Sequence, residues 1–211
     1  MNILITGGTG FIGKQIAIKI LELGTISFDG QAAQTIDKVI LFDAFAGEEL
    51  PQDPKIQVIT GDITDKSLVE KITENIDVVW HLAAVVSSAA EADFDLGMNV
   101  NLYGLLTLLE ALRKHGSKPR VIFASGCAVF GGELPDVVTD QTVVTPKSSY
   151  GMQKAIGELL VSDYSRKGFI DGRVLRLPTI VVRPGKPNKA ASTFFSSIIR
   201  EPLNGETAIC P

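Results

Sequence analysis

The first 23 residues constrain the fold of this chain more than any other segment. Residues 1–6 form a short apolar run rich in β-branched side chains, which is typical of a buried parallel strand. Gly7, Gly8, Gly10 and Gly13 follow at once, and residues 11–23 carry apolar side chains at helical spacing. Glycines let the backbone approach a pyrophosphate closely, and a helix N-terminus offers free N–H donors. This order of strand, turn and helix therefore predicts a dinucleotide-binding unit.

The second predicted strand, residues 38–42, ends at Asp43. A carboxylate there can accept hydrogen bonds from both hydroxyls of a ribose, and it repels a 2′-phosphate. No Arg or Lys follows in residues 44–47, so the sequence favours NAD over NADP. Asp43 lies 30 residues after Gly13 instead of the usual ~20, which predicts an insertion over residues 24–37. An ordinary turn is the alternative role for Asp43.

Strands and helices alternate along the rest of the chain. Strands are predicted over residues 56–60, 77–81, 120–124 and 173–177, and helices over about 65–75, 92–114 and 149–166. This pattern predicts an α/β fold with a Rossmann-like, doubly wound parallel sheet, whose ligands lie past the carboxyl ends of the strands. At those ends, Asp62 either faces the adenine or caps the next helix. His81 is expected to be a packed or hydrogen-bonded residue, and the small Ala83 and Ala84 leave room for a cofactor.

Tyr150 and Lys154 lie four residues apart on the helix predicted over residues 149–166 and so share one face. An ammonium beside a phenol favours the phenolate, which would lower the pKa of the tyrosine from about 10. Such a tyrosine is a general acid/base for a hydroxyl or a ketone. The spacing alone also fits an ordinary helix face, but together with the N-terminal unit it predicts a catalytic pair.

Composition narrows the class of protein further. The net charge is −4 and no basic cluster occurs, which argues against a nucleic-acid surface. Cys127 and Cys210 have neither metal-binding spacing nor a disulfide framework, so no metal is expected. The apolar stretches are far shorter than a membrane span, and Met1 directly precedes the first strand, which leaves no room for a signal peptide. We therefore expect a soluble, cytoplasmic protein of one good-sized domain.

With these residues in place, the chain resembles the extended short-chain dehydrogenase/reductase family, in particular its NAD-dependent epimerase/dehydratase group, over nearly its whole length. The matching motifs are residues 6–13, Asp43, residues 61–62, residues 81–84, Asn101 with Gly104, residues 129–131 and residues 150–154. The resemblance implies an NAD cofactor, a proton-accepting Tyr150, and a Lys154 that lowers the pKa of the tyrosine and holds the nicotinamide ribose. The implied cofactor-binding residues are Gly7, Gly10, Phe11, Ile12, Gly13, Asp43, Asp62, Ile63, Leu82, Ala83, Ala84, Asn101, Lys154, Pro178 and Ile180.

Residues 176–188 are similar to a branch of this family that oxidises the C2 hydroxyl of a four-carbon sugar acid, D-erythronate, with NAD. The similarity implies an oxidoreductase acting on a secondary hydroxyl of a small sugar acid. Arg183, Lys186 and Asn188 follow a strand end and could bind such a substrate, while solvated loop charge is the other reading of the two cations. The alternatives are a nucleotide-sugar epimerase or dehydratase with the same pair, and an NAD-binding module with weak or no catalysis.

The sequence departs from the family pattern at Gly126, where relatives carry a Ser or Thr that orients the substrate oxygen. Ser125 lies one residue earlier. Either Ser125 takes that catalytic role through a backbone rotation at Gly126, or the role is missing, which strand alternation favours. Relatives also carry a C-terminal substrate domain, which is expected to be truncated here. This divides the chain into an NAD-binding domain, residues 1–180, and the start of a substrate-binding region, residues 181–211.

The resemblance further implies a homodimer, in which the helix before the fifth strand and the helix bearing Tyr150 pair with their copies. The first of these helices carries more leucines than one buried face needs, and an exposed apolar patch usually marks a partner surface. These leucines are Leu102, Leu105, Leu106 and Leu109.

Overall fold

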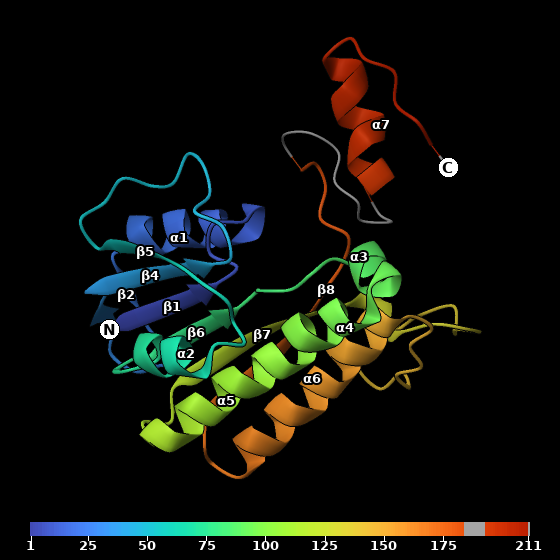
Figure 1. Cartoon of the computed structure of the whole chain (residues 1–211). Coiled ribbons are helices and arrows are strands. Elements are labelled where there is room, and N and C mark those ends of the chain that lie inside the picture. The colour runs from blue at the N-terminus through green and yellow to red at the C-terminus, as the bar shows by residue number, and fades with distance from the viewer. Residues whose placement is uncertain (184–192, 211) are drawn as a thin grey trace.

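The computed structural model describes residues 1–183 and 193–210 and has a six-stranded sheet at its centre (Figure 1). The strand order is β5-β4-β1-β6-β7-β8, and every neighbouring pair is parallel. The expected doubly wound parallel sheet is therefore confirmed. The direction of strand order reverses between β1 and β6, and in such sheets ligands bind in the crevice outside the carboxyl ends at that point. The strands are β1 (Asn2–Thr6), β4 (Lys38–Asp43), β5 (Ile56–Thr60), β6 (Val78–His81), β7 (Arg120–Gly126) and β8 (Asp171–Leu177).

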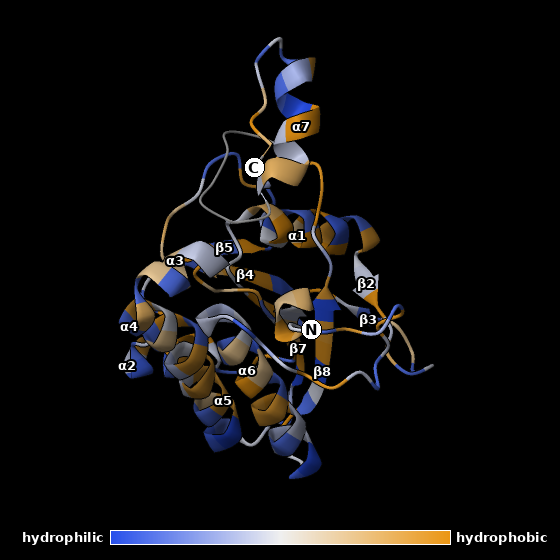
Figure 2. Cartoon of the chain, turned by 90° about the vertical axis from the view of Figure 1, so that its right-hand side faces the viewer, coloured by the Kyte–Doolittle hydropathy of each residue, from blue (hydrophilic) through white to orange (hydrophobic). Residues whose placement is uncertain are grey.

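Helices cover both faces of the sheet because alternate strand residues bury in opposite directions. Ile3 and Ile5 belong to the buried cluster that contains Ala17 of α1. Leu4, between them, belongs to the cluster that contains Leu105 of α5. Figure 2 shows apolar residues on the strands and on the helix faces turned toward them. The main helices are α1 (Phe11–Leu23) on one face, and α2 (Lys66–Ile72), α5 (Gly104–His115) and α6 (Ser149–Arg166) on the other.

The single helix predicted over residues 92–114 is wrong. Asp93 has extended backbone angles, φ −132° and ψ 94°, and its side chain accepts the Leu96 N–H, so a new helix begins there. The segment therefore contains α3 (Ser87–Ala92), α4 (Phe94–Gly97), a π-helical stretch η1 (Met98–Tyr103) and then α5. Short π-helical stretches often occur at functional sites, and this one carries Asn101.

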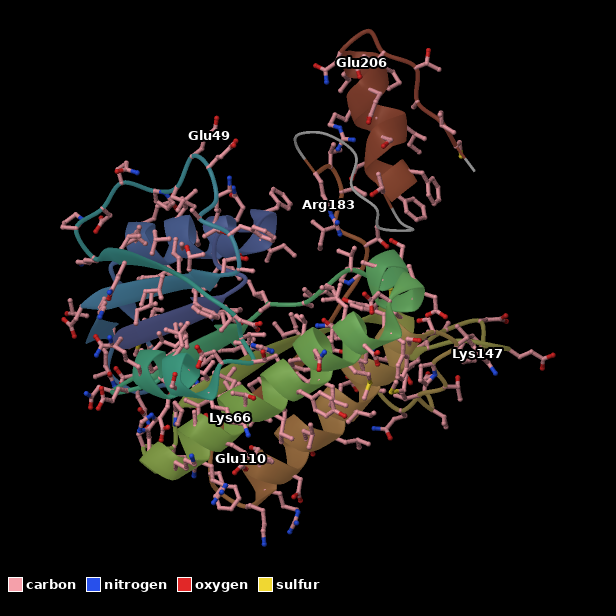
Figure 3. The ribbon with its side chains drawn as sticks, viewed as in Figure 1. Glu49, Lys66, Glu110, Lys147, Arg183 and Glu206 are labelled. Atoms are coloured by element: carbon pink, nitrogen blue, oxygen red, sulfur yellow. The ribbon has the colours of Figure 1, made fainter. Side chains whose placement is uncertain are left out.

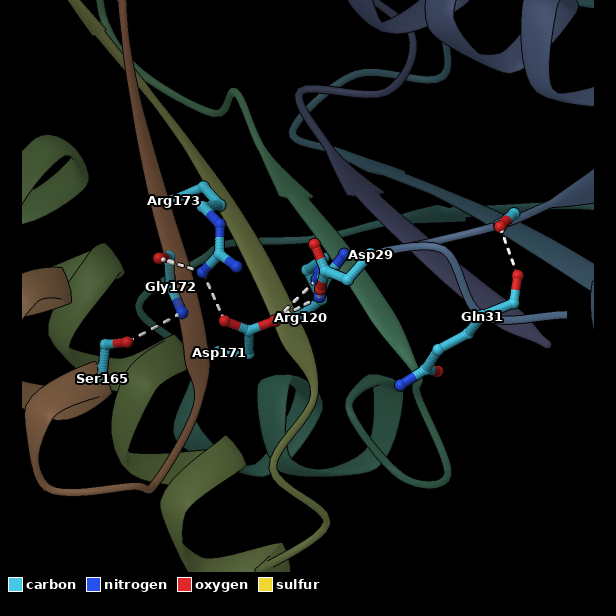
Figure 4. Close-up of polar contacts among 8 residues, drawn as sticks. Asp29, Gln31, Arg120, Ser165, Asp171, Gly172 and Arg173 are labelled. Carbon is cyan, nitrogen blue, oxygen red and sulfur yellow. Dashed lines mark hydrogen bonds and ion pairs between the residues drawn. The ribbon is translucent and has the colours of Figure 1, made fainter. Parts of the chain in front are cut away.

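The predicted insertion, residues 24–37, contains a short hairpin of β2 (Thr25–Ile26) and β3 (Gln34–Thr35). Arg120, at the start of β7, lies 4.2 Å over the Phe28 ring and binds both Asp29 and Asp171 (Figure 4). The hairpin is thus fastened to the amino ends of β7 and β8. Because this edge lies opposite the carboxyl ends, the insertion leaves the functional edge of the sheet unchanged.

The last described element, α7 (Phe194–Leu203), stands apart from the sheet (Figures 1 and 2). It is joined to the end of the β8 segment through Arg183, whose N–H donates to Ser196 Oγ and whose carbonyl accepts from Arg200. The division at residue 180 stays a prediction. Within the described ranges, no helix has both the length and the apolar composition needed to cross a membrane.

Candidate active site

The glycine-rich turn between β1 and α1 packs too tightly for other residues. A Cβ on Gly13 would lie 2.4 Å from the Gly7 carbonyl oxygen, and one on Gly7 would lie 2.9 Å from the Ala83 nitrogen. Gly7 also has a φ of +69°, which favours glycine. A Cβ on Gly10, the N-cap of α1, would meet only the Gly7 oxygen, at 3.3 Å. The turn is therefore closed toward the protein and open at the helix N-terminus, where unpaired N–H groups attract an anion.

Asp43 is held at the carboxyl end of β4, beside this turn. Its Oδ2 accepts the Thr9 N–H at 3.2 Å, and its Oδ1 accepts the Ala44 N–H at 2.8 Å. The Thr9 hydroxyl donates in turn to the Phe45 carbonyl, which fastens the loop after β4 to the glycine turn. Each carboxylate oxygen of Asp43 retains a free lone pair, so the side chain can still accept hydrogen bonds from a ribose.

A cavity of about 850 Å³ lies next to Asp43 at the carboxyl edge of the sheet. Asp62 lines it and accepts hydrogen bonds from both the N–H and the hydroxyl of Thr64. The alternative role of Asp62 as a helix cap is wrong, because Asp65 caps α2. The predicted cofactor residues in this lining are Gly7, Gly10, Asp43, Asp62, Ile63, Leu82, Ala83 and Ala84, and the others include Phe45, Leu96 and Val100.

A second cavity, of about 360 Å³, shares Leu82 and Ala84 with the first. The two cavities together form one crevice along the carboxyl ends of β4, β1, β6 and β7. A dinucleotide fits this arrangement, because the glycine turn and Asp43 are at one end and titratable groups are at the other. The predicted residues in the second lining are Ile12, Ser125, Tyr150, Lys154, Pro178, Ile180 and Arg183, together with Gly126, the position where the family pattern has a Ser or Thr. The lining also includes Ser87, Cys127 and Thr179, which the sequence did not indicate as site residues.

Lys154 is buried and points back at the sheet. Its Nζ donates to the Ala124 carbonyl at 2.8 Å and lies 5.0 Å from the centroid of the Phe123 ring. Burial lowers the pKa of Lys154 to about 8. The Nζ also lies 5.5 Å from the centroid of the Tyr150 ring, so the predicted pair is brought together.

The predicted lowering of the Tyr150 pKa by Lys154 does not appear in this structure. Burial raises the pKa of Tyr150, the neighbouring Cys127 raises it further, and the charge of Arg183 opposes both. The reason is geometric, since the Lys154 ammonium donates to a backbone carbonyl. Figure 3 shows Arg183 where the chain leaves the sheet toward α7.

Ser125 is buried and its hydroxyl donates to Glu158 of α6 at 2.5 Å. Gly126 has extended angles, φ −166° and ψ 170°, so the backbone rotation that would turn Ser125 to the substrate is absent. A Cβ on Gly126 would meet only the Leu177 carbonyl oxygen, at 3.6 Å. Room for a serine side chain therefore exists at position 126, on the opposite face of the strand from Ser125.

Asn101 and His81 line neither cavity, but they hold segments next to the crevice. The Asn101 side chain accepts the Val85 N–H at 2.9 Å and donates to Gln153 Oε1 at 2.8 Å, which fixes the loop after β6 against α6. Gln153 is fully buried. Its only sequence signal is its place beside Lys154. His81 is packed as expected, with its Nδ1 2.8 Å from the Thr6 hydroxyl, and burial, together with the charge of Lys154, lowers its pKa to about 3.

The remaining predicted residues are placed differently. Phe11 and Gly13 lie in the first turn of α1 and line neither described cavity. Lys186 and Asn188 lie outside the described residues.

Comparison with known proteins gives consistent matches. The profile of the NAD dependent epimerase/dehydratase family matches residues 3–210. Over its full length the chain is 58% identical to a D-erythronate dehydrogenase of Cupriavidus necator and 49% identical to one of Haemophilus influenzae. It spans 65% of the length of each of these relatives.

Two solved epimerase structures have the same architecture as this chain. A nucleoside-diphosphate-sugar epimerase of Agrobacterium tumefaciens superposes with a TM-score of 0.90 at 46% identity, covering 100% of this chain and 62% of its own. A UDP-glucose 4-epimerase of Thermus thermophilus in complex with NAD superposes with a TM-score of 0.82 at 27% identity, covering 99% of this chain and 64% of its own.

The buried Lys154 generates a prediction about stability. Its pKa falls from 10.5 to about 8 on folding, so between these values the unfolded chain binds a proton that the folded protein does not. The free energy of unfolding without cofactor should therefore rise as the pH rises from about 8 to 10.5, by about 3 kcal/mol at most. Lys154→Met should abolish this rise and stabilise the protein at pH 7. Urea unfolding at several pH values measures it, with the exposed Lys167→Met as control; parallel curves for native protein and Lys154→Met would contradict the prediction.

Proposed function

The chain belongs to the NAD-dependent epimerase/dehydratase family, and we propose that it acts as an NAD-dependent dehydrogenase on a secondary hydroxyl of a small sugar acid such as D-erythronate. The observation that carries the proposal is the placement of Tyr150, Lys154 and Arg183 around one cavity that continues into the dinucleotide crevice. The identity to two D-erythronate dehydrogenases over the whole chain supports this substrate class.

We propose NAD over NADP as the cofactor. Asp43 lines the larger cavity, where its carboxylate would bind the hydroxyls of the adenosine ribose and would repel a 2′-phosphate. The residues after it, from Ala44 to Gly47, include no cation that could bind such a phosphate. The glycine turn would hold the pyrophosphate, and the shared wall of Leu82 and Ala84 would let the nicotinamide half reach Tyr150.

In the proposed reaction, Tyr150 takes the proton of the substrate hydroxyl. NAD, when bound, supplies the redox chemistry by accepting a hydride from the carbon that bears this hydroxyl, which leaves a ketone. Lys154 has its ammonium beside the Tyr150 ring and would hold the nicotinamide ribose. Because burial raises the pKa of Tyr150, nearby positive charge is needed to favour the phenolate, and Arg183 supplies part of it.

Arg183 is proposed to bind the carboxylate of the sugar acid. It lines the same cavity as Tyr150, and a guanidinium can hold a carboxylate through two parallel hydrogen bonds. In a nucleotide-sugar epimerase the same cation would meet a diphosphate. A nucleotide-sugar epimerase is therefore the second candidate function, and the similarity to two solved epimerase structures supports it.

The test is a screen of sugar acids of four to six carbons with NAD, followed by the absorbance of NADH. Native protein should form free NADH, and Tyr150→Phe should abolish turnover while NAD affinity stays unchanged, because the substitution removes only the acid/base oxygen. Tyr103→Phe, outside the cavity, is the matched control. NAD binding without NADH formation from any sugar acid would favour an epimerase or a binding module.

A parallel titration with NAD and NADP tests the cofactor preference. Equal affinity for the two cofactors would show that Asp43 does not select against a 2′-phosphate.

The missing hydroxyl at position 126 gives a second prediction for this reaction. Gly126→Ser fits the observed space and should raise the turnover number, because it adds a donor for the substrate oxygen. Ser125→Ala should lower the rate by less than tenfold, since the Ser125 hydroxyl donates to Glu158 and Glu158 keeps its ion pair with Arg176. Steady-state kinetics of the two variants decide between the roles. A loss of about 10²–10³ in rate for Ser125→Ala would assign the orienting role to Ser125 instead.

We also propose a homodimer through the outer faces of α5 and α6. Two of the four leucines predicted for this interface cannot contribute to it, because Leu105 and Leu109 are fully buried in the core of this chain. Leu102 and Leu106 are half-buried, and the apolar side chains that remain exposed on this layer are Tyr103, at 49%, and Leu159, at 72%. The cytoplasmic location stays a prediction.

Leu159→Glu should weaken dimerisation, because it places a charge in the proposed apolar interface. Light scattering at micromolar protein concentration measures the mass. Val143→Glu, which changes a similarly exposed valine in a loop, is the control and should leave the dimer intact. A monomeric native protein at this concentration would contradict the proposed dimer.

A further inference from the structure

Glu158 is a buried carboxylate on the helix that carries the catalytic pair. It follows Lys154 by four residues and therefore lies on the same face of α6. Only 9% of the residue is exposed. A buried carboxylate is costly and weak evidence for stability, since apolar residues of similar volume often stabilise a protein more. Its presence therefore calls for another reason.

The contacts of Glu158 reach the ends of two strands at once. Its Oε1 accepts the hydroxyl of Ser125 on β7, and its two oxygens bind Arg176 on β8, with Nε–Oε1 at 3.0 Å and Nη2–Oε2 at 2.7 Å. The Arg176 guanidinium also lies 5.0 Å over the ring of Phe130. One side chain of α6 thus connects β7, β8 and the segment after β7.

The segments that Glu158 connects are those that wall the catalytic cavity. Ser125 lies between Ala124, whose carbonyl binds Lys154, and Gly126. Arg176 directly precedes Leu177 and Pro178, which line the same cavity as Tyr150. A shift of either strand end relative to α6 would therefore change the distance between Tyr150 and a bound substrate.

We propose that Glu158 is a positioning residue, which acts through Ser125 and Arg176 to fix the cavity walls of β7 and β8 against the helix that bears Tyr150 and Lys154. The proposal rests on the proposed dehydrogenase function for its kinetic part. It explains the buried charge, and it gives Ser125 a role that does not require contact with substrate. A purely structural ion pair would stabilise the fold without affecting the rate of a folded variant.

The test uses a double variant, because Glu158→Gln alone leaves Arg176 without its charged partner and would destabilise the fold. The double variant Glu158→Met/Arg176→Met replaces the pair with apolar side chains of similar length, which preserves folding. The double variant should be folded, with a melting temperature lowered by only a few degrees because the buried Ser125 hydroxyl loses its acceptor, and its dissociation constant for NAD should match that of native protein. Its turnover number should fall by about tenfold to a hundredfold with little change in KM, the scale for a misplaced reacting group.

The matched control is Asp163→Asn, which breaks the exposed Asp163–Arg166 pair on the same helix. It should leave the kinetics unchanged. Amide hydrogen exchange over residues 124–128 is measured in the same proteins and does not depend on turnover; exchange should accelerate at least tenfold in the double variant but not in the control. A folded double variant with a turnover number within twofold of native, or with unchanged exchange, would overturn the proposal. An inactive native protein with accelerated exchange in the double variant would instead refute only the proposed function.

Discussion

The close contact between the glycine turn and its neighbours is the constraint on which the site depends. A side chain at position 13 would place its Cβ 2.4 Å from the Gly7 carbonyl oxygen, and Gly7 itself lies tightly against the loop after β6. Because these segments touch through backbone atoms, the N-terminus of α1 is brought to the carboxyl edge of the sheet, where Ile12 lines the crevice. The crevice is therefore a consequence of missing side chains as much as of the ones that line it.

Buried charge on α6 is the second constraint, and it opposes stability. Lys154 and Glu158 are both nearly inaccessible to solvent, and each is satisfied by a strand end of the sheet. Burial disfavours the ammonium of Lys154, as its lowered pKa shows. A site that keeps such groups gives up stability for geometry, which is common where activity requires strained or destabilised arrangements.

Local patterns predicted the parts of the fold that depend on local physics. The bounds of α1, α6 and β5 agree with the sequence prediction, because periodicity and flanking glycines or polar residues define them. The prediction of one helix over residues 92–114 was wrong, because Asp93 caps a new helix while the apolar periodicity continues across the break. The crevice residues followed from strand ends. The contact of Ser125 with Glu158, and the raised pKa of Tyr150, depend on tertiary packing that no local pattern contains.

Strand alternation explains why Ser125 cannot simply replace a residue at position 126. Successive residues of an extended strand face opposite sides, and the backbone of Gly126 is extended. The direction that brings the Ser125 hydroxyl to Glu158 is therefore the direction that takes it away from the side on which a residue at 126 would project. The strand end gains an anchor to α6, and the substrate side of the cavity loses a donor. Removing one oriented donor of this kind typically costs about 3–4 kcal/mol of barrier, so in the proposed reaction the orientation of the substrate oxygen would fall to Tyr150 and to an Arg183 that holds the carboxylate.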